Sequence, residues 1–290
     1  MIYQATHITR YRYESPVSQS QSEARLTPRT FPGQTLHESR LHLQPEPAVL
    51  EHRKDYFGND VTSFAIFKTH DRFSATAVSV VEVEPKTWGM IPTITWEGTR
   101  DEVAAHSDVA LLEPYEFTFD SPYVAAAPEL ADYAAPTFSA GRPFIDAVTE
   151  LSHRIHAEFR YEPKSTSIDM PLLEVLGNRR GVCQDFAHIM IGALRTLRLP
   201  ARYVSGYLKS GNTYQGAGAS HAWVSVFVPG SGWFDFDPTN DVRPSDGHVT
   251  LGWGRDYGDV TPVKGIALGG GEQIVEVEVR VEPMDLPPIT

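Results

Sequence analysis

The chain is poor in cysteine, in positive charge and in long apolar runs, and each shortage excludes a class of protein. Its 290 residues hold one cysteine, which excludes an internal disulfide and a zinc site built from several thiolates. Lys and Arg number 25 against 37 Asp and Glu, and the net charge of -12 makes nucleic acid and anionic membranes poor partners. No stretch approaches the roughly 20 apolar residues of a membrane helix, and the first residues lack a signal-peptide pattern. The sequence therefore predicts a cytoplasmic protein.

Hydrophobic residues make up 41% of the chain, enough for one large or two ordinary folded domains. In the N-terminal part, residues 3–13 alternate between aromatic or apolar and polar side chains, which is typical of a strand with one buried face. Gly58-Asn59 is favourable hairpin-turn chemistry between two further strand-like runs. Residues 1–85 are therefore predicted to form a β-sandwich. Residues 86–140 show little periodicity, and we expect a connector with one or two short helices.

Residues 141–290 predict an α+β domain, in which helices precede an antiparallel sheet. Apolar residues recur at helical spacing from Phe144 to Phe159, and a second helix over 170–176 should end at Gly177. A third helix should begin just after Gly181 and end before Pro200. The strands expected after it cover 201–208, 219–228, 233–237 and the alternating segment 274–282, the last as an edge strand because one of its faces is charged.

The single cysteine, Cys183, stands at the start of the third predicted helix, after a glycine that permits a tight turn. Unpaired backbone N–H groups at a helix start favour a thiolate and can also bind an oxyanion. The neighbouring Gln184 could add an oxyanion donor, or it could cap the helix. The alternative for Cys183 is a buried structural residue, since cysteine is among the residue types most often buried. Its position alone leaves both interpretations open.

A histidine and an aspartate complete a possible catalytic set. His221 begins one predicted strand and Asp237 closes the next, and the segment 229–232 between the two strands predicts a hairpin. A regular hairpin with a four-residue loop would turn Asp237 away from His221. An odd-numbered loop, such as one that pairs Val228 with Gly232, or a bulge would bring the two side chains to one face. A cysteine on a helix packed against this sheet would then complete a Cys–His–Asp arrangement.

Three segments resemble the core motifs of the transglutaminase-like superfamily and follow the same order: Gly-Val-Cys183, Ser-His221-Ala-Trp and Gly-Trp-x-x-x-Asp237-Pro-Thr. Other segments are similar to bacterial members, namely Tyr11-x-Tyr13, Pro16-Val17, Arg25-Leu-x-Pro28, Phe57-Gly-Asn59, Gly254-Arg-Asp-Tyr257 and Pro262-Val-x-Gly265. The resemblance implies an N-terminal domain of the bacterial transglutaminase-like type over 1–85 and a papain-like catalytic core over 141–290. It also implies that Cys183 is the nucleophile, His221 the base and later the acid, and Asp237 the orienting carboxylate.

Other residues are weaker candidates. Tyr161 lies where relatives place an aromatic or polar group near the cleft, but it could equally pack in the core. Trp223 is expected in the cleft wall or the core, with substrate contact as the lesser alternative. His221, Asp235 and Asp237 could be imagined as metal ligands, yet the chain has no HExxH or CxxC pattern. We therefore expect neither a metal nor another cofactor.

The predicted activity is attack on an amide bond through a thioester, with a peptide or protein as substrate. Hydrolysis, as in a cysteine peptidase or amidase, is the first interpretation, because relatives of this size are often assigned as peptidases. Transamidation of glutamine by an amine is the second. An interpretation of another class is a binding module without catalysis, with the N-terminal domain as its recognition surface. It predicts an unreactive thiol.

Overall fold

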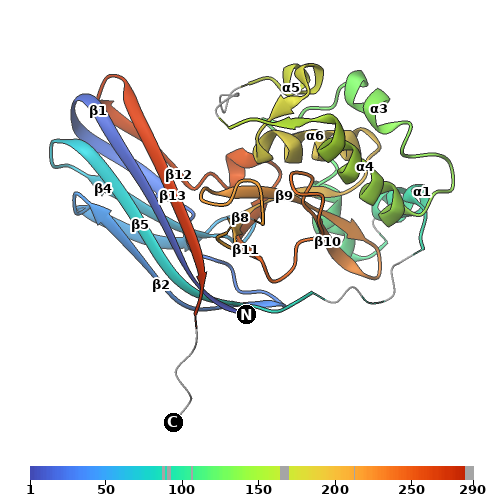
Figure 1. The fold of residues 1–290 in the computed structure, drawn as a ribbon, viewed down its shortest axis with the longest axis horizontal. Helices are drawn as coiled ribbons and strands as arrows, with labels where there is room; N and C mark the ends of the chain where they lie inside the picture. Colours follow the sequence, from blue (N-terminus) through green and yellow to red (C-terminus); the bar gives the residue numbers. More distant parts are fainter. Residues whose placement is uncertain (87–88, 90–92, 106, 164–169, 212, 285–290) are drawn as a thin grey trace, which may run out of the picture.

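A computed structural model describes residues 1–86, 89, 93–105, 107–163, 170–211 and 213–284. Its N-terminal sheet is built around one long strand, β1 (Ile2–Ala24). The first half of β1 pairs with β5 (His70–Val83) and the second half with β4 (Asp60–Ile66). The strands β2 (Gln34–Gln44) and β3 (Val49–Lys54) extend the sheet to the order β2-β5-β1-β4-β3. These strands form the left part of the molecule in Figure 1.

The last two strands of the chain belong to this N-terminal sheet. The strand β12 (Val263–Gly269) pairs with the second half of β1, and β13 (Gln273–Pro283) pairs with the first half. The alternating segment 274–282 is thus a strand, as predicted, and among the described strands it pairs with β1 alone, as an edge strand does. Its assignment to the core within 141–290 needs correction. Periodicity reveals a strand but not its partner, and here the partner lies at the other end of the chain.

The predicted sandwich within residues 1–85 takes the form of one seven-stranded sheet that includes β12 and β13. The register of β1 against β5 shifts between Arg12 and Val17, just before β4 takes over as the partner of β1. Phe64 of β4 and Phe73 of β5 stack with ring centroids 5.5 Å apart, and both belong to one buried cluster. The two halves of the sheet therefore pack face to face, as the layers of a sandwich do.

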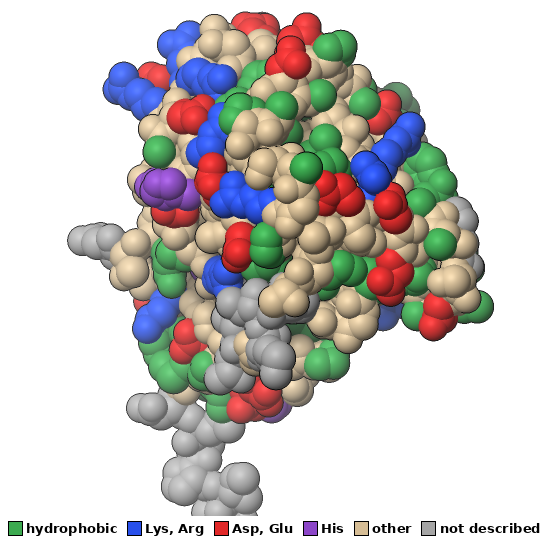
Figure 2. All heavy atoms as spheres, turned by 90° about the vertical axis from the view of Figure 1, so that its right-hand side faces the viewer, with side chains coloured by type: hydrophobic (Ala, Val, Ile, Leu, Met, Phe, Trp, Pro, Cys, Tyr) green, Lys and Arg blue, Asp and Glu red, His purple; other side chains and the backbone are tan. Residues whose placement is uncertain are grey.

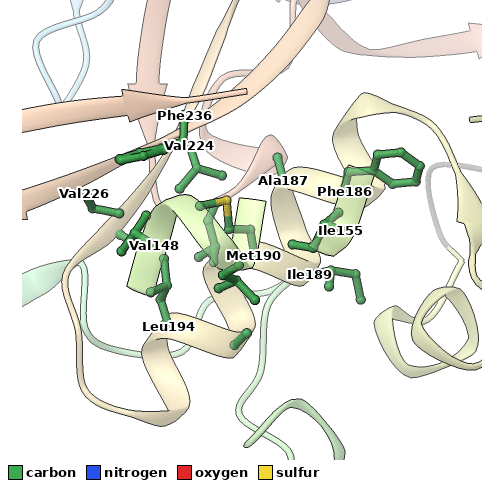
Figure 3. Packing of buried hydrophobic residues seen from close by; sticks show 14 of the residues in the cluster. Val148, Ile155, Phe186, Ala187, Ile189, Met190, Leu194, Val224, Val226 and Phe236 are labelled. Carbon is green, nitrogen blue, oxygen red and sulfur yellow. The ribbon is translucent and has the colours of Figure 1, made fainter. Parts of the chain in front are cut away.

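The core sheet has four antiparallel strands in the order β10-β9-β8-β11. They are β8 (Ala201–Leu208), β9 (His221–Val228), β10 (Gly232–Phe236) and β11 (His248–Gly254). The first three lie within two residues of their predicted bounds. One face of this sheet is apolar, and it packs against α4 (Phe144–Glu158) and α6 (Cys183–Thr196). Figure 3 shows side chains of both helices meeting Val224, Val226 and Phe236 of the sheet. The fold class is α+β, as predicted.

The predicted helices form, with different ends. The apolar positions of α4 from Phe144 to Ile155 are buried, as their spacing predicts. The next helix, α5 (Leu172–Asn178), runs through Gly177 and ends where Arg179 adopts a left-handed conformation with φ 52°. The prediction that Gly177 ends this helix was therefore wrong. The strand β6 (Arg160–Tyr161) lies between these two helices, and it pairs in parallel with β7 (Arg180–Gly181), which follows α5.

The segment expected to be a connector is largely part of the core. It contains α1 (Trp96–Ala104), the 3₁₀ helix η1 (Val109–Leu111), α2 (Leu112–Glu116) and α3 (Pro128–Ala134). Phe117 and Leu130 are fully buried, and Leu130 joins the same cluster as α4 and α6. The sequence did not reveal this because helices of one or two turns bury isolated residues and leave no long periodic face.

Two buried amide side chains join the N-terminal sheet to the core. Gln34 donates to the carbonyl of Thr250 (2.7 Å) and accepts from its N–H (2.8 Å). Asn59 does the same for Trp253, at 2.9 and 3.0 Å. Each amide thus replaces a neighbouring strand along the edge of β11. An apolar cluster that includes Tyr3, Val281 and Tyr207 continues this junction.

Figure 2 views the core from the right-hand side of Figure 1. Acidic and basic side chains are interspersed there, so the net charge of -12 is not gathered into one patch on this face. Among the described residues, no helix is long and apolar enough to cross a membrane.

Candidate active site

The nucleophile candidate Cys183 is the first residue of α6. The turn before the helix depends on Asp185, whose carboxylate accepts a hydrogen bond from the N–H of Val182 at 2.8 Å. A Cβ added to Gly181 would lie 2.5 Å from an oxygen of this carboxylate, so the position requires glycine. The Gly-Val-Cys-x-Asp sequence therefore fixes where α6 begins. It places the thiol beside the unpaired N–H groups of the first turn.

The hairpin between β9 and β10 has the odd-numbered loop that the sequence analysis required. Val228 pairs with Gly232, and Phe236 pairs with Val224. One more step along this register places Asp237 opposite Trp223, on the face that also carries His221. The two side chains meet: Nε2 of His221 lies 2.8 Å from Oδ2 of Asp237. The register prediction is confirmed.

Asp237 is fully buried and heavily hydrogen-bonded. Its Oδ1 accepts from the N–H groups of Thr239 (3.0 Å) and Asn240 (3.2 Å). Its Oδ2 accepts from the side-chain amide of Asn240 at 2.8 Å, in addition to His221. Burial alone would raise the pKa of Asp237, but the charge and hydrogen bonds of His221 and the hydrogen bond of a second histidine, His248, lower it well below its usual range. These interactions favour the ionised form of the carboxylate.

His221 is buried as well, with Nε2 bound to Asp237, so Nδ1 is the free end of its ring. Burial lowers the pKa of His221, but the charges of Asp237 and Cys183 outweigh it and raise the pKa to about 10. Nδ1 has no close hydrogen-bond partner among the described residues, although an interaction with the Cys183 thiol contributes to the raised pKa. The thiol is nevertheless close: Sγ of Cys183 lies 4.0 Å from the carbonyl oxygen of Ser220, the residue before His221. Asp237 and Cys183 therefore favour the charged, imidazolium form of His221.

Comparison with known proteins agrees with this arrangement. Residues 131–238, which include all three side chains, match the model of the transglutaminase-like superfamily, and residues 3–82 match the bacterial transglutaminase-like N-terminal region. An uncharacterized protein of Mycobacterium tuberculosis is 35% identical over 98% of this chain and 93% of its own length. An uncharacterized protein of Mycobacterium leprae is 36% identical over 95% of this chain and 96% of its own length. The chain belongs to the transglutaminase-like superfamily.

The fold also has a counterpart among solved structures. A protein of Cytophaga hutchinsonii, provisionally named a cysteine protease, superposes with a TM-score of 0.75 over all of this chain and 93% of the other. Its sequence is 21% identical, so the likeness concerns the fold. In this transglutaminase-like fold, the N-terminal sheet and the core occur together along the whole chain.

The weaker candidates lie around the transglutaminase-like site in different ways. Tyr161 is half-buried. A Cβ placed on Gly216 would lie 3.3 Å from the hydroxyl of Tyr161 and 3.0 Å from Nδ1 of His221, so both groups border the same space. Trp223 is 1% exposed, and its ring lies 6.3 Å from that of His221, so it packs behind the histidine. Gln184 is half-buried at the second position of α6. Of these three residues, Tyr161 is the one with a polar group, its hydroxyl, on the free side of the imidazole.

Two residues around Asp237 were missed by the sequence analysis. Asn240 had a local signal, since an aspartate that accepts from the N–H groups two and three residues later is common turn chemistry. His248, the second histidine bound to Asp237, had none, because its position depends on the placement of β11 beside β8 in the core sheet.

Asp235, the third residue considered as a metal ligand, lies apart from the site. It lies within β10, two residues before Asp237 and on the same face of the sheet, and it pairs with Lys86. Within the described ranges, no group of three or more His, Cys, Asp or Glu side chains could hold a metal ion.

Proposed function

We propose that this protein is a thiol-dependent amide-bond enzyme, and specifically a cysteine peptidase or amidase with a peptide or protein substrate. The observation that carries the proposal is the buried bond between His221 Nε2 and Asp237 Oδ2. It fixes the imidazole with its other nitrogen free, in the immediate surroundings of the only cysteine of the chain. Membership of the transglutaminase-like superfamily supports the same chemistry. The cytoplasmic location stays a prediction.

The acylation step follows from these positions. Nδ1 of His221 takes the thiol proton, and the thiolate of Cys183 attacks the carbonyl carbon of the amide. The oxyanion forms beside the backbone N–H groups at the start of α6. The imidazolium then returns the proton to the leaving nitrogen, the C–N bond breaks, and a thioester remains on Cys183. Asp237 keeps Nε2 protonated and stabilises the imidazolium throughout.

Deacylation decides between the two reaction types. In hydrolysis, His221 removes a proton from water, the hydroxide attacks the thioester, and a carboxylic acid leaves as the thiol is restored. In transamidation, an amine takes the place of water and a new amide forms. We assign Tyr161 as a further oxyanion or substrate contact because its hydroxyl borders the free side of His221, and Gln184 as a second donor at the helix start. The N-terminal sheet would bound the cleft or present the substrate.

The test is mass spectrometry of peptide libraries incubated with the protein, with and without added primary amines. We expect new carboxyl termini or deamidated side chains in both samples, and their loss with Cys183→Ala. Products that carry the amine would instead establish transamidation. Unchanged peptides in both samples, together with an unreactive thiol, would overturn the proposal in favour of a binding module.

A further inference from the structure

A second buried histidine shares the carboxylate oxygen that orients His221. His248 begins β11, on the far side of β8 from β9, and is 4% exposed. Its Nε2 lies 3.2 Å from Oδ2 of Asp237. An ionised carboxylate only accepts hydrogen bonds, so both histidines carry a proton on Nε2 and donate it to the same oxygen.

The ring of His248 is held in place from two sides. Its centroid lies 5.3 Å from the ring of Trp223 and 5.3 Å from the ring of Tyr214. Trp223 in turn lies beside His221, so the three rings line one face of the core sheet around Asp237. The ionisable groups that face His248 are Asp237, His221, Asp235 and Tyr214. Burial lowers the pKa of His248 despite the opposing charge of Asp237, so the ring is neutral near pH 7.

Satisfying the carboxylate does not require His248. Without it, Oδ2 of Asp237 still accepts from His221 and from the amide of Asn240, and Oδ1 still accepts from two backbone N–H groups. The histidine also costs stability, because its Nδ1 is buried and has no hydrogen-bond partner among the described residues. An apolar residue would fill the same space without an unpaired polar atom. A packing role therefore does not account for a histidine here.

We propose that His248 is a positioning residue, which fixes the orientation of Asp237 and shares its negative charge with His221. The inference rests on the proposed function, since it concerns the same imidazole. A neutral N–H bound to Oδ2 spreads the charge of the carboxylate over two partners. If His248 is removed, the full charge faces His221, whose imidazolium then holds its proton more tightly. The proton needed by the leaving amine is then released less readily.

The test compares His248→Leu, which removes the donor, with His248→Gln, whose amide nitrogen can take the place of Nε2. The pH at which His221 loses its proton is followed by NMR of the ring nitrogens. We expect a rise of about one pH unit in His248→Leu and a return to within a few tenths of the wild-type value in His248→Gln. His7→Leu is the matched control, since His7 is equally buried but bonds to Thr9 in the N-terminal sheet.

Loss of thermal stability alone would be shared by His248→Leu and His7→Leu, whereas the shift belongs to His248→Leu only. The same His221 midpoint in wild type, His248→Leu and His248→Gln would overturn the inference. If His248→Leu does not fold, His248→Asn replaces it, because its shorter amide does not reach Oδ2. Alkylation of Cys183 in the same samples separates the two proposals. A thiol that is unreactive in wild type defeats the proposed function, while the His221 midpoint still reports on His248.

Discussion

Gln34 and Asn59 bury neutral amides at the junction of the two sheets, whereas His221 and Asp237 bury a pair of ionisable groups at the end of the core sheet. At the junction, each amide bonds both the N–H and the carbonyl of one β11 residue, so both backbone groups have partners, and Asn59 is itself held by Arg29 and Asp55. At the site, Nδ1 of His221 is left without a hydrogen-bond partner among the described residues. At the junction, the backbone groups of β11 that the amides contact all have hydrogen-bond partners. At the site, one ring nitrogen of His221 stays open on the side where a thiol and a substrate would act.

This difference separates stability from reactivity. Changes at the junction should alter the free energy of unfolding and leave the chemistry of Cys183 unchanged. Changes at the site should alter reactivity far more than their effect on folding suggests, because they act on a proton and a charge. Four predictions test this separation, beginning with the largest expected effect.

Asp237→Asn should lower turnover by about 10²- to 10⁴-fold, because the amide no longer fixes the tautomer of His221 or stabilises its charge. The measurement is the rate on any peptide found in the library screen. Asp235→Asn is the matched control, since Asp235 lies on the same strand and face but pairs with Lys86. It should change turnover by no more than a few fold. Equal losses in both variants would contradict a specific role of Asp237 in orienting His221.

Asn59→Ala should lower the free energy of unfolding by about 3 kcal/mol, because it leaves the N–H and carbonyl of Trp253 buried without partners. Urea denaturation measures this loss. Asn178→Ala, at an exposed position of α5, should stay within about 0.5 kcal/mol of wild type. The rate of Cys183 alkylation should be the same in all three proteins. A changed rate in Asn59→Ala would mean that junction and site are coupled.

The pH dependence of stability should come from the site. The pKa of His221 is raised from 6.5 to about 10, so its stabilising contribution is complete below pH 6.5 and is lost as the pH rises towards about 10. Asp237, whose pKa is lowered, has the opposite sign and contributes above its unfolded pKa. Urea unfolding between pH 6.5 and 9.5 should show falling stability in wild type and Asn59→Ala. His221→Gln should lack this part of the decline, and an unchanged slope would contradict the assignment.

The sequence predicted the helix start and the pairing of His221 with Asp237 because both depend on local features. A glycine before Cys183 marks the start of α6, and one short hairpin sets the face on which Asp237 lies. The need for Asp237 to face His221 was enough to state that a working site requires an odd-numbered loop or a bulge. The predicted strands and α4 followed from periodicity in the same way.

The features that the sequence did not reveal depend on distant partners. His248 reaches Asp237 only because β11 lies beside β8 in the core sheet. The strands β12 and β13 join β1 from the opposite end of the chain, and alternation of apolar residues names no partner. Gln34 and Asn59 sit in segments that read as strand and turn, and their bonds to β11 could be seen only once both sheets were placed.

The central claim is that His221 activates Cys183, and alkylation at low pH tests it most directly. A thiolate held by an imidazolium stays reactive below neutral pH, whereas an isolated thiol does not. Iodoacetamide at about pH 6 should therefore label wild-type Cys183 readily, and His221→Ala should slow the labelling strongly. Asp237→Asn should have a milder effect on labelling than on turnover. Slow labelling at the same rate in wild type and both variants, repeated in mild denaturant that opens the buried site, would contradict the account.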